Sequence, residues 1–292
     1  NQIYDRVFIR DITNAALLGV NNNTKVYYAF YTSGTDPCAQ AFATGFEGTG
    51  ITLDALRLGN SGVINSERAI DADQNNFSQI SLGVAAVGGT ASQNFYFTTS
   101  SNATDDFNLR FKTSPALLTL GLLNNIRVTA YNGIDEVFTQ TLDPTLLNLE
   151  LLTLVNNGSI VSIPFSPGRS FDRVKVTLSS LVNANLTQTI DVYGLTRSAG
   201  RPTFTAPASN AVAACYNAPV VLTATTANTN ELIWYDALQG GSPLATVAYN
   251  GGFTTPALTA NKTYYVAARR LNCTNESVRV PVVITVDPQI TF

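Results

Sequence analysis

The feature that most constrains this fold is the alternation of apolar and polar residues in many short segments. In residues 174–178 and 278–286, for example, every second residue is Val, Leu or Ile. A period of two places the apolar side chains of a strand on one face, so each segment predicts a half-buried β-strand. Turn-forming pairs such as Asn132-Gly133 separate the segments at short intervals. The chain is therefore predicted to be all-β, with spacing typical of sandwiches and jelly rolls.

Two Leu-rich stretches, residues 115–123 and 142–154, do not follow this alternation. A continuous apolar run has no readable period, so each is compatible with a buried strand or with a short helix.

Composition narrows the function classes. Of the 292 residues, 45% are hydrophobic and 13% charged, which predicts folded cores rather than a disordered tail. The net charge is -3 and there is no basic run, so nucleic acid is not expected as a partner. The chain has no His, which removes the usual general base of hydrolases and the commonest zinc ligand. We expect no enzyme activity, although two distant carboxylates could still form a glycosidase pair.

An internal repeat indicates the domain organisation. Residues 4–7, Tyr-Asp-Arg-Val, return as Phe-Asp-Arg-Val at 171–174. The offset between these copies nearly equals the length of the segment 35–200. We therefore predict that residues 1–34 are the terminal strands of a preceding copy and that 35–200 form the next copy of a tandem array. Chance similarity of two β segments is the alternative. Neighbouring repeats are then the expected partners.

A linker follows this unit. Alternation stops near residues 198–202, and a stretch rich in Pro, Ala and Ser leads into the remaining segment. Residues 201–292 have the size of one immunoglobulin-like sandwich. No apolar run approaches the ~20 residues of a membrane span, so membrane insertion is not expected.

Three cysteines, Cys38, Cys215 and Cys273, allow one disulfide in an oxidising compartment. Cys215 and Cys273 share the C-terminal region and are the predicted pair, which leaves Cys38 without a partner within this chain. Three free thiols are the alternative. The order Cys215, Trp234, Cys273 is similar to that of immunoglobulin domains.

Residues 67–77, with the pattern Ala-Ile-Asp-Ala-Asp, resemble the discoidin-like, or galactose-binding-like, jelly-roll superfamily. The pair of strands at 173–176 and 190–194, which closes on Tyr-Gly, is similar to the end of such domains. Ala72 stands where that family usually has Gly, and Thr189 where Glu is frequent. The resemblance implies a discoidin-like sandwich in 35–200, followed by an immunoglobulin-like sandwich.

The same layout resembles repeat modules of very long cell-surface proteins of Bacteroidota. Members of that group are exported by the type IX route, and some are adhesins of gliding motility. The resemblance implies an extracellular, cell-surface fragment that mediates adhesion or surface display. Two alternatives stay open: a non-binding spacer of a surface stalk, and a carbohydrate-binding accessory region of a secreted polysaccharide-degrading enzyme.

A calcium site is the one metal candidate. Asp71, Asp73 and Asn75 occupy every second position of an expected loop, and three such oxygen side chains can converge on Ca²⁺. In discoidin-like relatives a residue of the closing strand completes the site, which here implies Thr189 or Asp191. The alternative is a solvated turn whose side chains bind their own backbone.

Polysaccharide or cell-surface glycans are the expected ligands, but no ligand-binding residue can be named from the sequence. The loop tips at Asn60, 102–106 and Asn132 are the places to expect one. Most Tyr and Phe residues fall in alternating strands, where core packing is the more economical explanation.

Overall fold

The computed structural model describes residue 38 and residues 40–51, 62–71, 73–82, 87–118, 121–143, 155–180, 188–204 and 209–287. The predicted terminal strands of a preceding repeat, at 1–34, lie outside these residues, and so does the Tyr-Asp-Arg-Val copy at 4–7.

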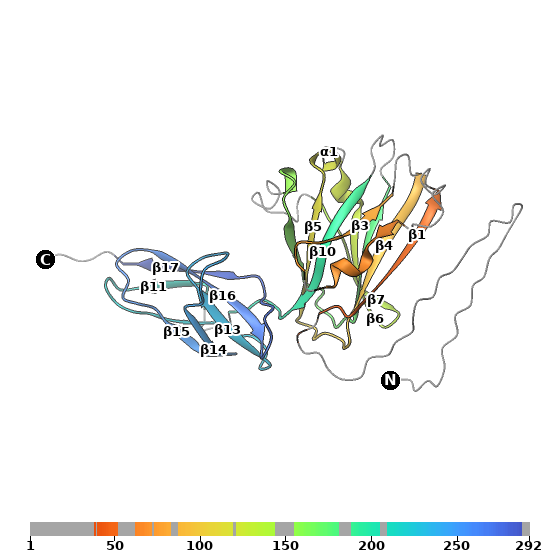
Figure 1. The fold of residues 1–292 in the computed structure, drawn as a ribbon. Coiled ribbons are helices and arrows are strands. Elements are labelled where there is room, and N and C mark those ends of the chain that lie inside the picture. The colour runs from red at the N-terminus through yellow and green to blue at the C-terminus, as the bar shows by residue number, and fades with distance from the viewer. Residues whose placement is uncertain are drawn as a thin grey trace, which may run out of the picture. The chain divides into compact units, whose positions relative to one another are not determined.

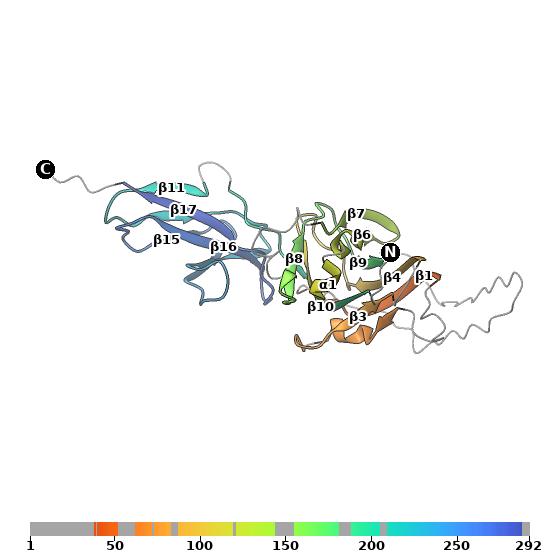
Figure 2. The same ribbon diagram turned by 90° about the horizontal axis from the view of Figure 1, so that it is seen from above.

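The first sandwich contains two five-stranded antiparallel sheets, as the alternation predicted. The first sheet has the strand order β1-β4-β9-β6-β7, and the second has the order β2-β3-β10-β5-β8. In Figure 2, β6, β7 and β9 lie in one layer and β3 and β10 in the other. The strands are β1 Ala43–Ile51, β2 Val63–Ile64, β3 Ser78–Ser81, β4 Val87–Tyr96, β5 Asp106–Thr113, β6 Ile126–Asn132, β7 Asp135–Thr141, β8 Val161–Phe165, β9 Arg173–Ser179 and β10 Thr189–Ser198.

The core of this sandwich follows from the period of two. Val174, Val176 and Leu178 of β9 are fully buried, while the residues between them reach the surface of the sheet. Burial of each such side chain contributes about 1.5–3 kcal/mol, so one strand in this register is a large part of the stability. One Leu-rich stretch that the sequence left open is now assigned: it forms the short helices α1, Pro115–Leu118, and η3, Leu122–Asn125. Residues 144–154, most of the other stretch, lie outside the described residues.

The second sandwich is built on one five-stranded sheet with the order β11-β17-β16-β13-β14 and a two-stranded sheet of β12 and β15 (Figure 1). Trp234 is fully buried and its ring stacks on Phe253, with ring centroids 5.6 Å apart. In chain order, β11 and β17 are the first and last strands of the five-stranded sheet, and they pair in parallel. The strands are β11 Ala211–Ala214, β12 Val221–Thr223, β13 Asn230–Tyr235, β14 Ala245–Ala248, β15 Gly252–Thr254, β16 Lys262–Arg270 and β17 Val280–Val286.

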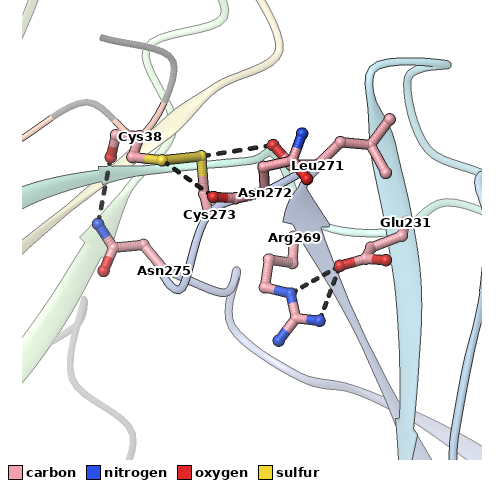
Figure 3. The surroundings of a disulfide bond; sticks show 7 residues. All are labelled: Cys38, Glu231, Arg269, Leu271, Asn272, Cys273 and Asn275. Atoms are coloured by element: carbon pink, nitrogen blue, oxygen red, sulfur yellow. Dashed lines mark hydrogen bonds and ion pairs between the residues drawn. A yellow bond between two sulfur atoms is a disulfide. The ribbon is translucent and has the colours of Figure 1, made fainter.

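The disulfide prediction was wrong. The structure pairs Cys38 with Cys273 and leaves Cys215 as an exposed free cysteine (Figure 3). Cys273 follows Arg270 at the end of β16, where Arg270 contacts Asp105 of the first sandwich. Cys215 follows β11, whose last residue pairs with Val286, at the opposite end of the same sheet. A bridge needs its two α-carbons within about 7 Å, and those of Cys38 and Cys273 lie 5.0 Å apart. The bridge therefore joins the two sandwiches instead of lying within the second.

Polar contacts reinforce this junction. Arg270 of β16 donates to Asp105 Oδ2 at 2.5 Å, and Asp105 lies in the turn before β5 of the first sandwich. Gly200, in the connection, packs so closely that a β-carbon built on it would lie 1.9 Å from the Thr104 carbonyl oxygen. Only a residue without a side chain fits this connection unchanged.

Candidate functional site

The predicted calcium loop forms a turn that binds its own backbone. Asp71 Oδ1 accepts a hydrogen bond from the Asp73 amide, and Asp73 Oδ1 accepts one from the Asn75 amide, both at 2.9 Å. All three side chains are exposed. This is the geometry of consecutive Asx turns, the alternative that the sequence left open. The side-chain amide of Asn76 closes the turn by donating to Asp71 Oδ2.

The fourth predicted ligand has a partner of its own. Asp191 lies on β10 opposite Gln79 of β3, and the Gln79 side-chain Nε2 donates to Asp191 Oδ1 at 2.8 Å. Within the described ranges, no three His, Cys, Asp or Glu side chains gather in a way that could hold a metal ion. One oxygen beside this loop could still contact a cation: Asn76 Oδ1 is buried and lacks a hydrogen-bond partner. Calcium binding therefore stays a prediction.

The structure places the loop tips that were named from the sequence in different surroundings. Asn60 lies outside the described residues. Residues 102–106 belong to the junction, where Asp105 and Asp106 face Arg270 and Arg201 of the second sandwich and its connection. Asn132 ends β6 and accepts a hydrogen bond from the Ser100 hydroxyl at 3.2 Å.

An aromatic row instead crosses the outer face of the first sheet. Tyr96 of β4, Arg173 of β9 and Tyr131 of β6 are register partners, so their side chains form a line across three strands. The Arg173 guanidinium carbon lies 4.1 Å from the Tyr131 ring centroid and 6.0 Å from that of Tyr96. Both are cation–π contacts, which fix the rings on the solvent side of the sheet. All three side chains are half-buried.

The next row continues this surface. Lys175 lies beside Arg173 on β9, 5.4 Å from the Tyr131 ring centroid, and its ammonium pairs with Glu47 at 3.1 Å. Burial lowers the pKa of Lys175, but contacts with Tyr131 and Glu47 outweigh that effect and raise it, so this lysine is charged at neutral pH. We call the surface formed by Tyr96, Tyr131, Arg173 and Lys175 the tyrosine face.

A groove of about 770 Å³ lies where the two sandwiches meet. Its lining combines polar side chains, such as those of Arg201 and Arg279, with apolar ones, such as those of Ile163 and Val278. Among the described residues that line it, Phe165 is the one aromatic residue, and it is almost wholly buried in the core. The groove therefore offers no ring for a sugar to stack on, and the tyrosine face is the stronger candidate for a glycan contact.

Asp106, in this junction, gives a pH-dependent prediction. Burial raises the pKa of Asp106 above its usual 3.8; Asp105 adds to the effect, while Ser166 and Arg201 oppose it. Because the pKa of Asp106 is higher in the folded state than in the unfolded state, protonation of this side chain stabilises the fold. The stabilisation is complete at pH values below the unfolded-state pKa and is lost as the pH rises through the folded-state pKa. We expect Asp106→Asn to melt at a higher temperature than the native protein at pH 7.

The difference between Asp106→Asn and the native protein should disappear in thermal melts as the pH falls below 3.8, because Asp106 is then protonated in both the folded and the unfolded state. Asp135→Asn, at an exposed hairpin position, is the matched control and should show no such convergence. A variant less stable than the native protein at pH 7 would contradict this prediction.

Comparison with known proteins supports the reading of the second sandwich. Residues 202–288 match the family model of the "Ig-like domain CHU_C associated". This match confirms the immunoglobulin-like prediction for that part of the chain. The all-β prediction is confirmed as well, because the described elements are almost entirely strands. No curated protein matches the chain in sequence.

Three solved structures share limited similarity with the chain. The adhesin domain of Epf from Streptococcus pyogenes is 12% identical, covers 86% of this chain and 96% of its own length, and has a TM-score of 0.28. The GalNAc-bound module GH31 CBM32-2 is 7% identical, covers 53% and 97%, and has a TM-score of 0.27. The "FMN-binding beta-glucuronidase from Facaelibacterium prausnitzii L2-6" is 10% identical, covers 85% and 40%, and has a TM-score of 0.27.

Proposed function

We propose that this chain is an adhesive region of an extracellular cell-surface protein and that it contacts polysaccharide through the tyrosine face. Two features of the chain support an extracellular location. A disulfide joins the two sandwiches, as is typical of oxidising compartments. The second sandwich matches an immunoglobulin-like family. Separately, none of the helices in the described ranges has the length and apolar character needed to cross a bilayer.

The glycan contact depends on one observation: the row of Tyr96, Arg173 and Tyr131 on the outer side of the sheet. Residues on a strand face that do not pack in the core are usually polar, and two rings there need a reason. Sugar rings present apolar faces that stack on aromatic side chains, with polar groups fixing the hydroxyls. Arg173 between the two rings and Lys175 in the next row supply such polar groups.

The resemblance to repeat modules of Bacteroidota surface proteins extends this proposal. It supports a long, tandemly repeated protein, exported by the type IX route, in which neighbouring repeats are the partners and gliding motility is one setting. Repetition would multiply a weak contact at each tyrosine face into useful avidity. We also keep the proposal that the chain has no enzyme activity of its own.

The test is binding to soluble polysaccharides in native gels that contain hydroxyethylcellulose, xylan or alginate, followed by titration calorimetry with the best one. We expect Tyr96→Ala/Tyr131→Ala to weaken binding about thirty-fold, since the two rings form one central aromatic anchor whose loss costs about 2 kcal/mol. Tyr249→Ala, which removes an exposed tyrosine from the second sandwich, should bind as the native chain does. A native chain that none of the polysaccharides retards would favour the spacer alternative.

A further inference from the structure

The Cys38–Cys273 disulfide closes a covalent ring around most of the folded protein. The two cysteines are 235 residues apart in sequence. All the strands from β1 to β16 lie inside this ring, and of the strands that the structure describes only β17 lies outside it. The disulfide at the junction therefore also links Cys38 directly to Cys273, without passing through the residues between them.

From this topology we infer a mechanical function: the disulfide carries tension past both sandwiches. A pull applied between the N-terminal segment and the C-terminal end reaches Cys38, crosses the sulfur–sulfur bond to Cys273 and continues into β17. The enclosed residues are not in that covalent path, so none of them has to unravel for the load to pass while the bond is intact. The tyrosine face lies inside the ring, and its geometry would therefore be kept under tension.

The segment left in the path is already extended. β17 is a strand of seven residues that pairs with β16 on one side and β11 on the other. A strand rises about 3.3 Å per residue, close to the maximal reach of the chain, so pulling on its two ends adds little length. Val282 and Ile284 are fully buried, which holds the strand in the core, and the Asp287 amide donates to the Ala214 carbonyl just beyond its end.

The bridge is also supported on both sides. The Asn275 side chain donates to the Cys38 carbonyl at 3.4 Å (Figure 3). Cys273 is buried, and its amide donates to the Arg270 carbonyl. Arg270 in turn holds Asp105 of the first sandwich. The residues that position the disulfide are thus also the residues that hold the two sandwiches together. The disulfide and the contact between the sandwiches therefore depend on the same group of side chains.

Single-molecule stretching of the full chain tests this inference. Handles are attached through terminal tags that contain no cysteine, and each molecule is pulled to high force before and after a reductant is added. Reduction should add about 80 nm of contour length, from roughly 3.4 Å for each enclosed residue. The native protein serves in both arms, so the test does not require that a cysteine variant folds.

Two further measurements complete the test. Cys215→Ser removes the one thiol that could exchange with the bridge, and we expect its traces to match those of the native chain. Cys38→Ser should release the extra length without reductant. An equal released length in native molecules before and after reduction, or peptide mapping that finds Cys273 joined to Cys215, would overturn the inference.

Discussion

Replacing Asp105 with Ala should lower the free energy of unfolding by about 3–5 kcal/mol, since removal of one partner leaves the other charge buried and uncompensated. The Asp105 side chain is 1% exposed and that of its partner Arg270 is 15% exposed. Asp105 Oδ2 also accepts a hydrogen bond from the Asn102 amide at 2.8 Å, which the change removes as well. Urea unfolding followed by far-ultraviolet circular dichroism measures the loss.

A double variant distinguishes the cost of leaving one charge buried without its partner from the cost of shortening a side chain. Asp105→Ala/Arg270→Ala removes both charges, so we expect the double variant to be more stable than Asp105→Ala alone. Asp135→Ala, at an exposed position on β7, should change stability by no more than about 0.5 kcal/mol. A loss below about 1 kcal/mol for Asp105→Ala would mean that this pair acts as an ordinary surface ion pair.

The junction that this prediction tests could not be read from the sequence. Arg270 and Asp105 are 165 residues apart, and the two half-cystines are 235 apart. Local patterns determine which residues face a core, but they carry no information on which strand ends meet. Proximity in the chain favoured Cys215 as the partner of Cys273, and the tertiary fold brought Cys38 there instead.

Strand positions, in contrast, were predictable because they depend on local sequence. Phe95 and Val174 are fully buried, so the period of two places the residues that follow and precede them on the outer face. The same rule applied to Tyr96 and Arg173 would have placed both on that face. What the sequence lacked was the pairing of β4 with β9 and of β9 with β6, which turns single outward residues into a row.

The candidate site therefore arises from register rather than from a motif. The pattern at 71–75 carries a recognisable spacing, yet its side chains bind their own backbone. The tyrosine face has no spacing signal, since its members come from three strands that are far apart in the chain. An outer sheet face of this kind suits a long polymer that many repeats contact weakly, which is the functional setting proposed above.

Replacing Phe107 with Ala should destabilise the first sandwich by about 3–5 kcal/mol, the usual cost of removing a buried phenyl ring. Phe107 of β5 is fully buried and contacts three other rings. It stacks on Phe165 at 5.1 Å between ring centroids and meets Phe171 and Phe138 edge to face at 5.4 Å and 6.2 Å. Because Phe138 belongs to the first sheet and Phe165 to the second, the ring holds the two layers together.

Two probes distinguish the sandwiches in this experiment. The chain has a single Trp, and Trp234 lies in the core of the second sandwich, so its fluorescence reports on that sandwich. Calorimetry of Phe107→Ala should show the first sandwich melting about 10 °C lower, while the transition seen by Trp234 fluorescence moves less. Phe46→Ala, at a side chain 50% exposed on β1, removes the same ring without opening a cavity and should shift neither transition by more than a few degrees. If both variants lowered the melting temperature equally, the cluster around Phe107 would not be the centre of this core.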